Sequence, residues 1–481
     1  MKRIGKLMAG VTVLAVLAGI AFLSCAGGAR AAGAGFGASH DIVVIGAGGA
    51  GLSAAIAARE AGADVVIFEK MGMAGGNTIR ATGGMNASGT QYQARAGITD
   101  SVDLFIEDTI AGGGYINDRV LVRIMAEQSA QAIQWLSDMG ADLSDVGRLG
   151  GASANRAHRP TGGNPVGPEV TAALVNRAYA LGIPIILEAE VTAITTDNTG
   201  RATGVRVRHN NRNRTVTAQA VILAAGGFGA NNDMAAGLVP ALRGFATTNQ
   251  PGATGGGILL AQNIGAGLVD MEEIQTHPTH APDREMITEA VRGNGAIMTS
   301  RDGNRFVDEM GFRDLVSERI LAQPGGSAFL VFDDSVRASL AVINAYIGRG
   351  FVYQADTPQA LAVLIGAADG GAAMAATLAA YNASVASGID AQFGRTSMPR
   401  SLSSPPFFAI EVVPAIHHTM GGVRINSDTQ VLSAAGAVIP GLYAAGEVVG
   451  GIHGNNRLGG NAMIDIIVFG RIAGEKAAAG L

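Results

Sequence analysis

The hydrophobic positions of the chain form short buried runs that end in glycine and alternate with longer helical patterns. The first run, "DIVVIG" (41–46), is followed by a helical pattern to about residue 62 and by a second run, "DVVIFEK" (64–70). Two later runs, "VILAAGG" (221–227) and "GLYAAGE" (441–447), have the same form. Strands that alternate with helices in this way predict an α/β, Rossmann-like fold.

The pattern changes in the middle of the chain. An amphipathic helical pattern covers residues 119–139, and a final helix runs from about Asn461 toward the C-terminus. Between them, strand-then-glycine units become rare. We therefore expect an inserted α+β capping domain at 241–410, which divides the Rossmann-like domain into residues 41–240 and 411–481. The 481 residues are long enough for two such domains.

Composition narrows the class of protein. The chain is 48% hydrophobic and 15% charged, which is typical of a large folded core. Its net charge of −5 gives no basic surface for nucleic acid. The 70 glycines follow no collagen period, so we expect them where the backbone turns sharply or lies against a ligand. The single cysteine excludes an intrachain disulfide, a cysteine-based metal site and a C-x-x-C-H haem attachment site, and we expect no bound metal.

The N-terminus is typical of an exported protein. Basic residues precede an apolar run from Leu7 to Leu23. Two cleavage sites remain open: an A-x-A site ending at Ala31, or a lipoprotein box, "FLSC", ending at Cys25. An uncleaved anchor is a third alternative, because the run is at the lower limit for spanning a bilayer. We expect a signal or lipoprotein segment at 1–25, a linker at 26–40 and a periplasmic protein, with a lipid anchor if Cys25 is the cleavage site.

The first apolar run leads directly into Gly46-x-Gly48-Gly49-x-Gly51, which opens the predicted helix. Glycines at these positions let the backbone turn and approach a pyrophosphate at the helix N-terminus. Glu69 ends the next predicted strand 18 residues later, where it can accept hydrogen bonds from a ribose. The combination predicts a dinucleotide site.

Further glycine-rich segments favour FAD over NAD. A second glycine-rich stretch, 72–89, follows the acidic residue closely, and 224–227 and 444–447 bring two more strand ends toward the same crevice. Three glycine-rich segments at one crevice suit the long FAD molecule better than NAD. Arg457 lies just before the predicted start of the last helix, whose positive N-terminus would stabilise the reduced flavin ring.

The inserted region concentrates polar side chains that suit a small dianion. Hydroxyl, imidazole, guanidinium and carboxylate groups lie within 274–319, beside glycines. Arginine binds both oxygens of a carboxylate with its planar fork. The candidate residues are His277, Thr288, Glu289, Arg292, Arg313 and Asp314.

From about residue 41 to its end, the chain resembles the flavoprotein part of the soluble periplasmic fumarate reductases of the flavocytochrome c type. More distantly, it resembles the flavoprotein subunits of succinate dehydrogenase and quinol-linked fumarate reductase. The resemblance rests on several segments in order: "VIGAGGAGLSAA", "GGNTIRATGGMNA", "GGASANRAHRPTGG", "TEAVRGNGA", "HHTMGG" and "IPGLYAAGEVVGGIHGNNRLGGNA". It implies an enzyme that uses FAD to reduce fumarate to succinate.

The resemblance also implies how fumarate is bound. Arg457 and His417 would hold one carboxylate. His277, Thr288 and Glu289 would hold the other and twist it out of plane. The twist breaks conjugation and makes the alkene carbon more electrophilic.

The same resemblance assigns the chemistry. Flavin N5 would deliver hydride, and Arg313 would deliver the proton. Glu289 and Arg292 would return a proton to Arg313, and Asp314 would help to orient it. The free pKa of arginine exceeds 12, but the accepting carbon is itself very basic, so the transfer is feasible where geometry is fixed and water is excluded.

In "AIHHTMGG" (415–422), the resemblance implies that His418 lies against the pyrimidine edge of the flavin, while its neighbour faces the substrate. Met286 would be a further substrate contact. The full set of expected cofactor contacts is Gly46, Gly48, Ala50, Gly51, Glu69, Asn77, Thr78, Gly83, Gly84, Gly226, Gly227, His418, Glu447, Ala462 and Met463.

Three departures from the relatives matter. Asn77 stands where membrane-bound relatives have the histidine that bonds to FAD, so we expect non-covalent FAD. Gly256 stands where relatives often carry aspartate, which leaves that contact open. Without haem attachment sites, electrons are expected from a separate donor, such as a cytochrome c or a quinol-linked protein.

Two alternative functions stay open. Within the family, the substrate is another 2-enoate, such as urocanate, methacrylate or a cinnamate. Having His277, Thr288 and Glu289 together favours a second carboxylate, and hence fumarate. In a different class, the chain is a flavin electron carrier without turnover of its own, for which Arg313 would be dispensable.

Overall fold

The computed structural model describes residues 36–481. The predicted leader, both cleavage sites and most of the linker lie outside the described residues. Residues Gly37–Leu481 form one compact unit. Within the described part of the chain, no helix combines the length and the apolar character needed to cross a membrane.

The larger sheet has eight strands, in the order β18-β19-β9-β1-β2-β6, with β7 and β8 joined to it through β9. The strands at its centre, from β19 to β6, run parallel to one another. Its strands are β1 (Ser39–Ile45), β2 (Val65–Phe68), β6 (Ile185–Ile186), β7 (Glu190–Thr196), β8 (Ala202–His209), β9 (Arg212–Leu223), β18 (Gln430–Leu432) and β19 (Val438–Ala444). The central strands are buried, as expected for parallel strands covered on both faces, and the α/β prediction is confirmed.

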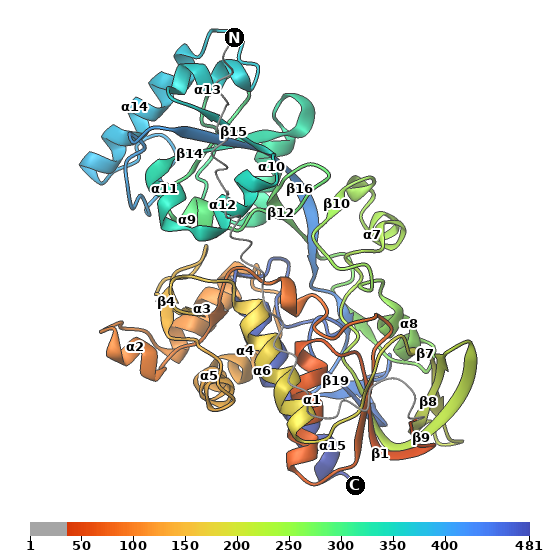
Figure 1. The fold of residues 1–481 in the computed structure, drawn as a ribbon. Coiled ribbons are helices and arrows are strands. Elements are labelled where there is room, and N and C mark those ends of the chain that lie inside the picture. The colour runs from red at the N-terminus through yellow and green to blue at the C-terminus, as the bar shows by residue number, and fades with distance from the viewer. Residues whose placement is uncertain (1–35) are drawn as a thin grey trace, which may run out of the picture. The chain divides into compact units, whose positions relative to one another are not determined.

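Three helices pack together beside this sheet: α1 (Gly49–Glu60), α6 (Val166–Ala180) and α15 (Asn461–Ala479) (Figure 1). The closest contact is between α1 and α15. A Cβ at Gly474 would lie 2.2 Å from the carbonyl oxygen of Ala54, so only glycine permits this approach. The first and last predicted helices are thereby confirmed, and their N-termini lie at the same end of the sheet.

The predicted helix at 119–139 is instead two helices, α4 (Arg119–Glu127) and α5 (Ser129–Asp138). The hydroxyl of Ser129 donates to the carbonyl of Ala126 and accepts from the backbone N–H of Ser88. A side chain that bonds to the backbone three residues earlier competes with the helical pattern, and the helix breaks at Gln128.

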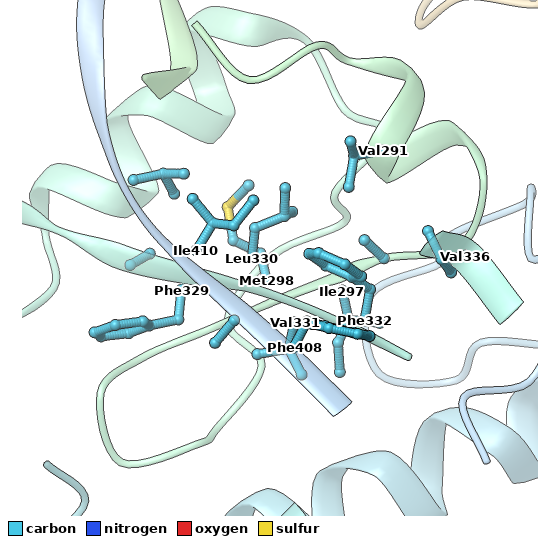
Figure 2. Packing of buried hydrophobic residues seen from close by; sticks show 14 of the residues in the cluster. Val291, Ile297, Met298, Phe329, Leu330, Val331, Phe332, Val336, Phe408 and Ile410 are labelled. Carbon is cyan, nitrogen blue, oxygen red and sulfur yellow. The ribbon is translucent and has the colours of Figure 1, made fainter. Parts of the chain in front are cut away.

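The second sheet has six strands and carries the apolar core of the inserted region (Figure 2). Its strands are β10 (Ala246–Thr247), β12 (Ile274–His280), β13 (Ile297–Thr299), β14 (Ala328–Asp333), β15 (Val352–Ala355) and β16 (Phe407–Thr419). The first half of β16 pairs with β14 and β15, and its second half pairs with β12 and β10. The mixture of this sheet with surrounding helices is the predicted α+β insertion. The domain boundaries stay a prediction, and the one at residue 410 falls inside β16.

Smaller elements complete the chain. Two small sheets consist of β3 (Met85–Asn86), β4 (Asp145–Gly147) and β5 (Ala157–Arg159), and of β11 (Leu268–Val269) and β17 (Gly422–Val423). The other α-helices are α2 (Gln91–Arg95), α3 (Val102–Gly112), α7 (Asn232–Leu238), α8 (Gly256–Gln262), α9 (Ala290–Gly293), α10 (Arg313–Leu321), α11 (Asp334–Ser339), α12 (Ala341–Gly348), α13 (Pro358–Leu364) and α14 (Ala372–Ser387). The 3-10 turns are η1 (Thr78–Arg80), η2 (Pro240–Leu242) and η3 (Pro324–Gly326).

Candidate active site

Two cavities of about 150 Å³ each lie side by side at the carboxyl ends of the parallel strands. The first cavity follows the glycine-rich turn after β1. The second cavity lies where the inserted region meets the start of α15. Both are lined by Asn77, Thr78, Glu447 and Ile466, so a single extended ligand can occupy them together.

The glycine-rich turn fits a pyrophosphate. Gly46 has a φ of +103°, and a Cβ there would lie 2.4 Å from the carbonyl oxygen of Ala224. Gly48 lines the first cavity and precedes α1 without a capping side chain, and a Cβ built on it would meet no protein atom within 4 Å. An open helix N-terminus beside an empty space is a binding site for a phosphate group.

Glu69 also faces the first cavity, at the end of β2. It is 7% exposed, and its two carboxylate oxygens accept backbone N–H groups of Ala47 (2.8 Å) and Met71 (2.9 Å). These bonds hold the carboxylate in place while leaving further acceptor capacity for a ribose. The first cavity therefore fits the nucleotide part of FAD.

Most of the predicted cofactor and substrate residues line one of the two cavities. Those in the first are Gly46, Gly48, Ala50, Glu69, Asn77, Thr78, Gly226 and Glu447. Those in the second are Asn77, Thr78, Gly83, Gly84, His277, Met286, Glu289, Arg313, His417, His418, Glu447, Arg457, Ala462 and Met463. The structure thus brings together side chains from β12, β16, α10 and the loop before α15.

Gly51 and Gly227 line neither cavity. A Cβ at Gly51 would lie 1.9 Å from the carbonyl oxygen of Gly46, so this glycine lets α1 approach the turn. A Cβ at Gly227 would lie 2.1 Å from the hydroxyl oxygen of Thr419. In this structure both glycines are required by the packing of the protein against itself.

Arg313, the first residue of α10, is held in the second cavity by a carboxylate and an amide. Its Nε and Nη2 donate to Oε2 of Glu289 at 2.9 and 2.6 Å, and its Nη1 donates to Oε1 of Gln275 at 3.3 Å. The orienting role predicted for Asp314 is wrong, because that side chain is exposed. Consecutive side chains on a helix point in different directions, so Asp314 does not share the face of Arg313.

Glu289 is a buried, ionised carboxylate between two guanidinium groups. Its Oε1 accepts the backbone N–H of Gly150 at 3.0 Å, and Nη2 of Arg292 lies 3.6 Å from its Oε2. Burial raises the pKa of Glu289, but the positive charges of Arg313 and Arg292 outweigh burial and lower it to about 2. The residue is therefore an acceptor of protons and hydrogen bonds near neutral pH.

Arg457 contributes a second guanidinium to the cavity and is 5% exposed. Its Nη2 donates to Oε1 of Gln275 at 3.0 Å, while its Nε has no hydrogen-bond partner within residues 36–481. Burial, followed by the positive charge of Arg313, lowers the pKa of Arg457 to about 9. A buried cation with an unpaired donor is suited to binding an anion.

Two histidines face each other across the same cavity. The rings of His277 and His417 are 5.0 Å apart. Burial and the neighbouring positive charges hold the pKa of both well below 6.5, so both are neutral at pH 7. Nδ1 of His277 accepts the backbone N–H of Thr279 (3.3 Å), which leaves its proton on Nε2.

His418 follows at an irregular point of β16, because Ile416 and His418 pair with the consecutive residues Thr276 and Gln275 of β12, and His417 is the extra residue between them. Its Nδ1 lies 3.6 Å from Oε1 of Glu447, and its ring meets that of His453 edge-on at 5.4 Å. His417 instead places Nδ1 2.6 Å from the hydroxyl oxygen of Thr248. The two adjacent histidines therefore have different partners.

Thr288 and Arg292 do not line the second cavity. The backbone N–H of Thr288 donates to the hydroxyl oxygen of Tyr346 at 3.2 Å. Arg292 is 1% exposed and lies behind Glu289. No group of three or more potential metal ligands occurs in the described part of the chain.

Gln275 is the central residue that sequence reasoning missed. It is 2% exposed on β12, and its amide nitrogen donates to Oδ1 of Asn456 (2.7 Å) and to the carbonyl of Arg457 (2.8 Å). The available signal is its position two residues before His277, which places both side chains on one face of a strand. Gln275 is not itself a lining residue, whereas Thr248 and Asn249 line the cavity and no sequence pattern indicates them.

The chain is similar to known FAD-binding proteins. A family model described as an FAD binding domain matches residues 41–463. A "fumarate reductase (cytochrome)" of Shewanella frigidimarina is 50% identical over 442 residues, which are 91% of this chain and 77% of that protein. A urocanate reductase of Eggerthella lenta is 36% identical, over 91% of this chain and 74% of that protein. The open conformation of a flavocytochrome c3 fumarate reductase matches with a TM-score of 0.79 and 43% identity, over 92% of this chain and 78% of that one.

Proposed function

The chain belongs to the FAD-binding oxidoreductase family that contains the fumarate reductases, and we propose that it reduces fumarate to succinate. The observation that carries this proposal is the position of Arg313. Glu289 and Gln275 hold it in a cavity that also contains Arg457 and two neutral histidines. A proton donor and an anion-binding guanidinium in one cavity suit the reduction of an unsaturated diacid.

Arg457 and His417 bind one carboxylate of fumarate, and His277 binds the other. Nε2 of His277 carries a proton, so it donates a hydrogen bond without needing a positive charge. The ionised side chain of Glu289 would repel a substrate carboxylate, so in this scheme only its backbone N–H is left to bind the substrate. In this scheme the side chain of Glu289 serves Arg313, and Thr288 supports the loop from behind the cavity.

FAD, when bound and reduced by the electron donor, would supply a hydride to one alkene carbon. Arg313 donates a proton to the other alkene carbon. Glu289 is ionised and acts as a relay: Arg292, 3.6 Å away, donates a proton to it, and Glu289 passes this proton to Arg313, whose Nε and Nη2 lie at its Oε2. Arg292 then regains a proton from solvent. The buried position of these groups keeps bulk water from the transfer.

FAD is bound non-covalently in this proposal. Asn77 lies between the two cavities, where its Oδ1 accepts the backbone N–H of Gln250 at 2.8 Å. An amide does not form the bond that a histidine makes to FAD. The proposed electron donor is a separate protein, such as a cytochrome c or a quinol-linked protein. Export to the periplasm, with a lipid at Cys25 if cleavage occurs there, is proposed from the leader pattern alone.

The test is a substrate panel with the purified, FAD-loaded protein. Oxidation of a reduced viologen would be followed with fumarate, urocanate and methacrylate as acceptors. We expect turnover with fumarate and little with the two monocarboxylates. Turnover with urocanate or methacrylate alone would overturn the assignment of fumarate, and no turnover with any acceptor would favour an electron carrier.

A further inference from the structure

A group of buried charged side chains lies behind Glu289 and outside the second cavity. It contains three guanidinium and two carboxylate groups, each at most 8% exposed: Arg292, Arg305, Glu309, Asp390 and Arg395. Removing one partner of a buried ion pair strongly destabilises the fold. Replacing the whole group with apolar residues of similar volume is often neutral or stabilising. Fold stability alone therefore does not explain why these charged residues are buried together. Their position relative to the cavity suggests another role.

Arg395 and Glu309 hold Arg292 at both of its ends. Nη2 of Arg395 donates to the backbone carbonyl of Arg292 at 2.7 Å. Nη1 of Arg292 donates to the backbone carbonyl of Glu309 at 2.6 Å. Arg395 and Glu309 are also joined to each other, by Nη1 and Oε2 at 3.0 Å. The main chain and the guanidinium of Arg292 are thus fixed by the same pair.

Arg305 and Asp390 in turn fix that pair. Nε and Nη2 of Arg305 bind the two carboxylate oxygens of Glu309 at 2.8 and 2.9 Å, and Nη2 also binds Asp390 at 3.0 Å. The guanidiniums of Arg305 and Arg395 both lie over the ring of Tyr381, at 5.4 and 5.6 Å from its centroid. A bidentate pair on an aromatic ring leaves little freedom of movement.

The contact of Arg292 with Glu289 is longer than its contacts with Glu309 and Arg395. The distance of 3.6 Å between Nη2 and Oε2 is an ion-pair distance, longer than a hydrogen bond. Nε and Nη2 of Arg292 have no hydrogen-bond partner in the part of the chain that the structure describes. Because proton transfer needs a separation of about 2.6–3.2 Å, a small shift of Arg292 decides whether transfer occurs.

We propose that Arg395 and Glu309 are positioning residues, which hold Arg292 where a short movement lets it return a proton to Glu289. They contact neither the cavity nor the reacting atoms, and act only through Arg292. This inference rests on the proposed function, because it concerns the return of the proton that Arg313 donates. It assigns a role in turnover to two residues that are 86 positions apart in sequence.

The first test is Arg395→Lys, which keeps the positive charge but loses the fork that reaches several acceptors. We expect kcat for fumarate to fall about 10- to 100-fold, as for small displacements of reacting groups. The Kd of fumarate, measured from the flavin absorption, and the FAD content should not change. The solvent deuterium isotope effect on kcat should rise, because proton return becomes slower. The matched control is Arg301→Lys, at an exposed arginine of the same region, which should change none of these.

The second test separates positioning from a structural role. In an Arg292→Gln background, Arg395→Lys should have almost no further effect on kcat, because its target is gone. Equal losses in both backgrounds, or an unchanged kcat and isotope effect, would overturn the inference. If Arg395→Lys does not fold, Asp390→Asn is the alternative variant, because it removes only one of the contacts of Arg305. It should raise the solvent isotope effect on kcat, and an unchanged isotope effect would overturn the inference. Failure of the wild-type protein to reduce fumarate would instead refute the proposed function.

Discussion

Gln275 and Arg457 bind each other twice. The amide nitrogen of Gln275 donates to the backbone carbonyl of Arg457 at 2.8 Å, and its amide oxygen accepts from the Arg457 guanidinium at 3.0 Å. The same oxygen accepts from Arg313 at 3.3 Å. A neutral acceptor thus holds two guanidiniums together without cancelling the charge of either.

Gln275→Glu tests the need for a neutral acceptor. A carboxylate there would pair with the guanidiniums of Arg313 and Arg457 and would repel a dianion, so we predict a kcat at least about tenfold lower and a higher KM. Steady-state kinetics with fumarate measures both. Gln354→Glu, at an exposed glutamine of β15, is the control for added charge. An unchanged kcat in Gln275→Glu would show that the neutral amide is not required.

Arg313→Ala should abolish most turnover. A positioned general acid contributes about 10²–10⁴-fold, so kcat should fall by that factor while FAD content stays the same. Arg313→Lys keeps a charge beside Glu289 and controls for misfolding. Arg319→Ala, at an exposed position on the same helix, should behave as wild type. A variant without Arg313 that retains more than about a hundredth of the rate would exclude this arginine as proton donor.

Fumarate binding should weaken in alkaline solution. The pKa of Arg457 is lowered to about 9 by burial and by Arg313, so this cation loses its proton at a lower pH than an ordinary arginine. Above about pH 9, the Kd of fumarate should rise by up to about tenfold per pH unit. His277 and His417 are neutral throughout this range and do not contribute. Titrations of the flavin absorption between pH 7 and 10 measure the effect, and a constant Kd would contradict it.

Glu289→Gln should change acid stability in a defined direction. The folded pKa of about 2 is below the ordinary 4.5, so the ionised group stabilises the fold above pH 4.5 and this contribution is lost as pH falls toward 2. At pH 7 the variant should be less stable by about 3 kcal/mol, and the difference should shrink below pH 4.5. Urea unfolding at pH 7 and pH 3 measures both values. Glu318→Gln, at an exposed position on α10, should show no such difference.

The flavin should leave the protein on denaturation. Because Asn77 stands where a covalent bond would need histidine, acid precipitation should release all FAD into the supernatant. Absorption of the supernatant and fluorescence of the protein band in a denaturing gel measure the two fractions. A fluorescent band would contradict non-covalent binding.

Local sequence patterns predicted the parts of the fold that depend on short spacings. The turn at Gly46 and the strand that ends before Glu69 are where the glycine and acidic positions place them. The break between α4 and α5 was not predicted, because the Ser129 hydroxyl that bonds to the carbonyl of Ala126 is also held by the backbone N–H of Ser88, far away in sequence.

In the candidate site, too, residue types were predictable from the sequence, whereas contacts between distant residues were not. Arg313 and Glu289 were indicated by residue type and by resemblance, and the structure brings them into contact. Gln275 was missed because its role depends on Arg457, 182 residues later. Asp314 was misassigned because adjacency in sequence is not adjacency on a helix. Pairings across the chain require the tertiary structure.

The strand β16 connects the apolar core around Phe408 and Ile410 (Figure 2) with His417 and His418, and its register against β12 shifts next to these histidines. Because His417 is an extra residue between two paired positions, an insertion or deletion of one residue along β16 would change this irregular register and turn the side chains that follow to the other face of the sheet. Length changes in this family are therefore expected in the surrounding loops, while the residue count of β16 stays constant.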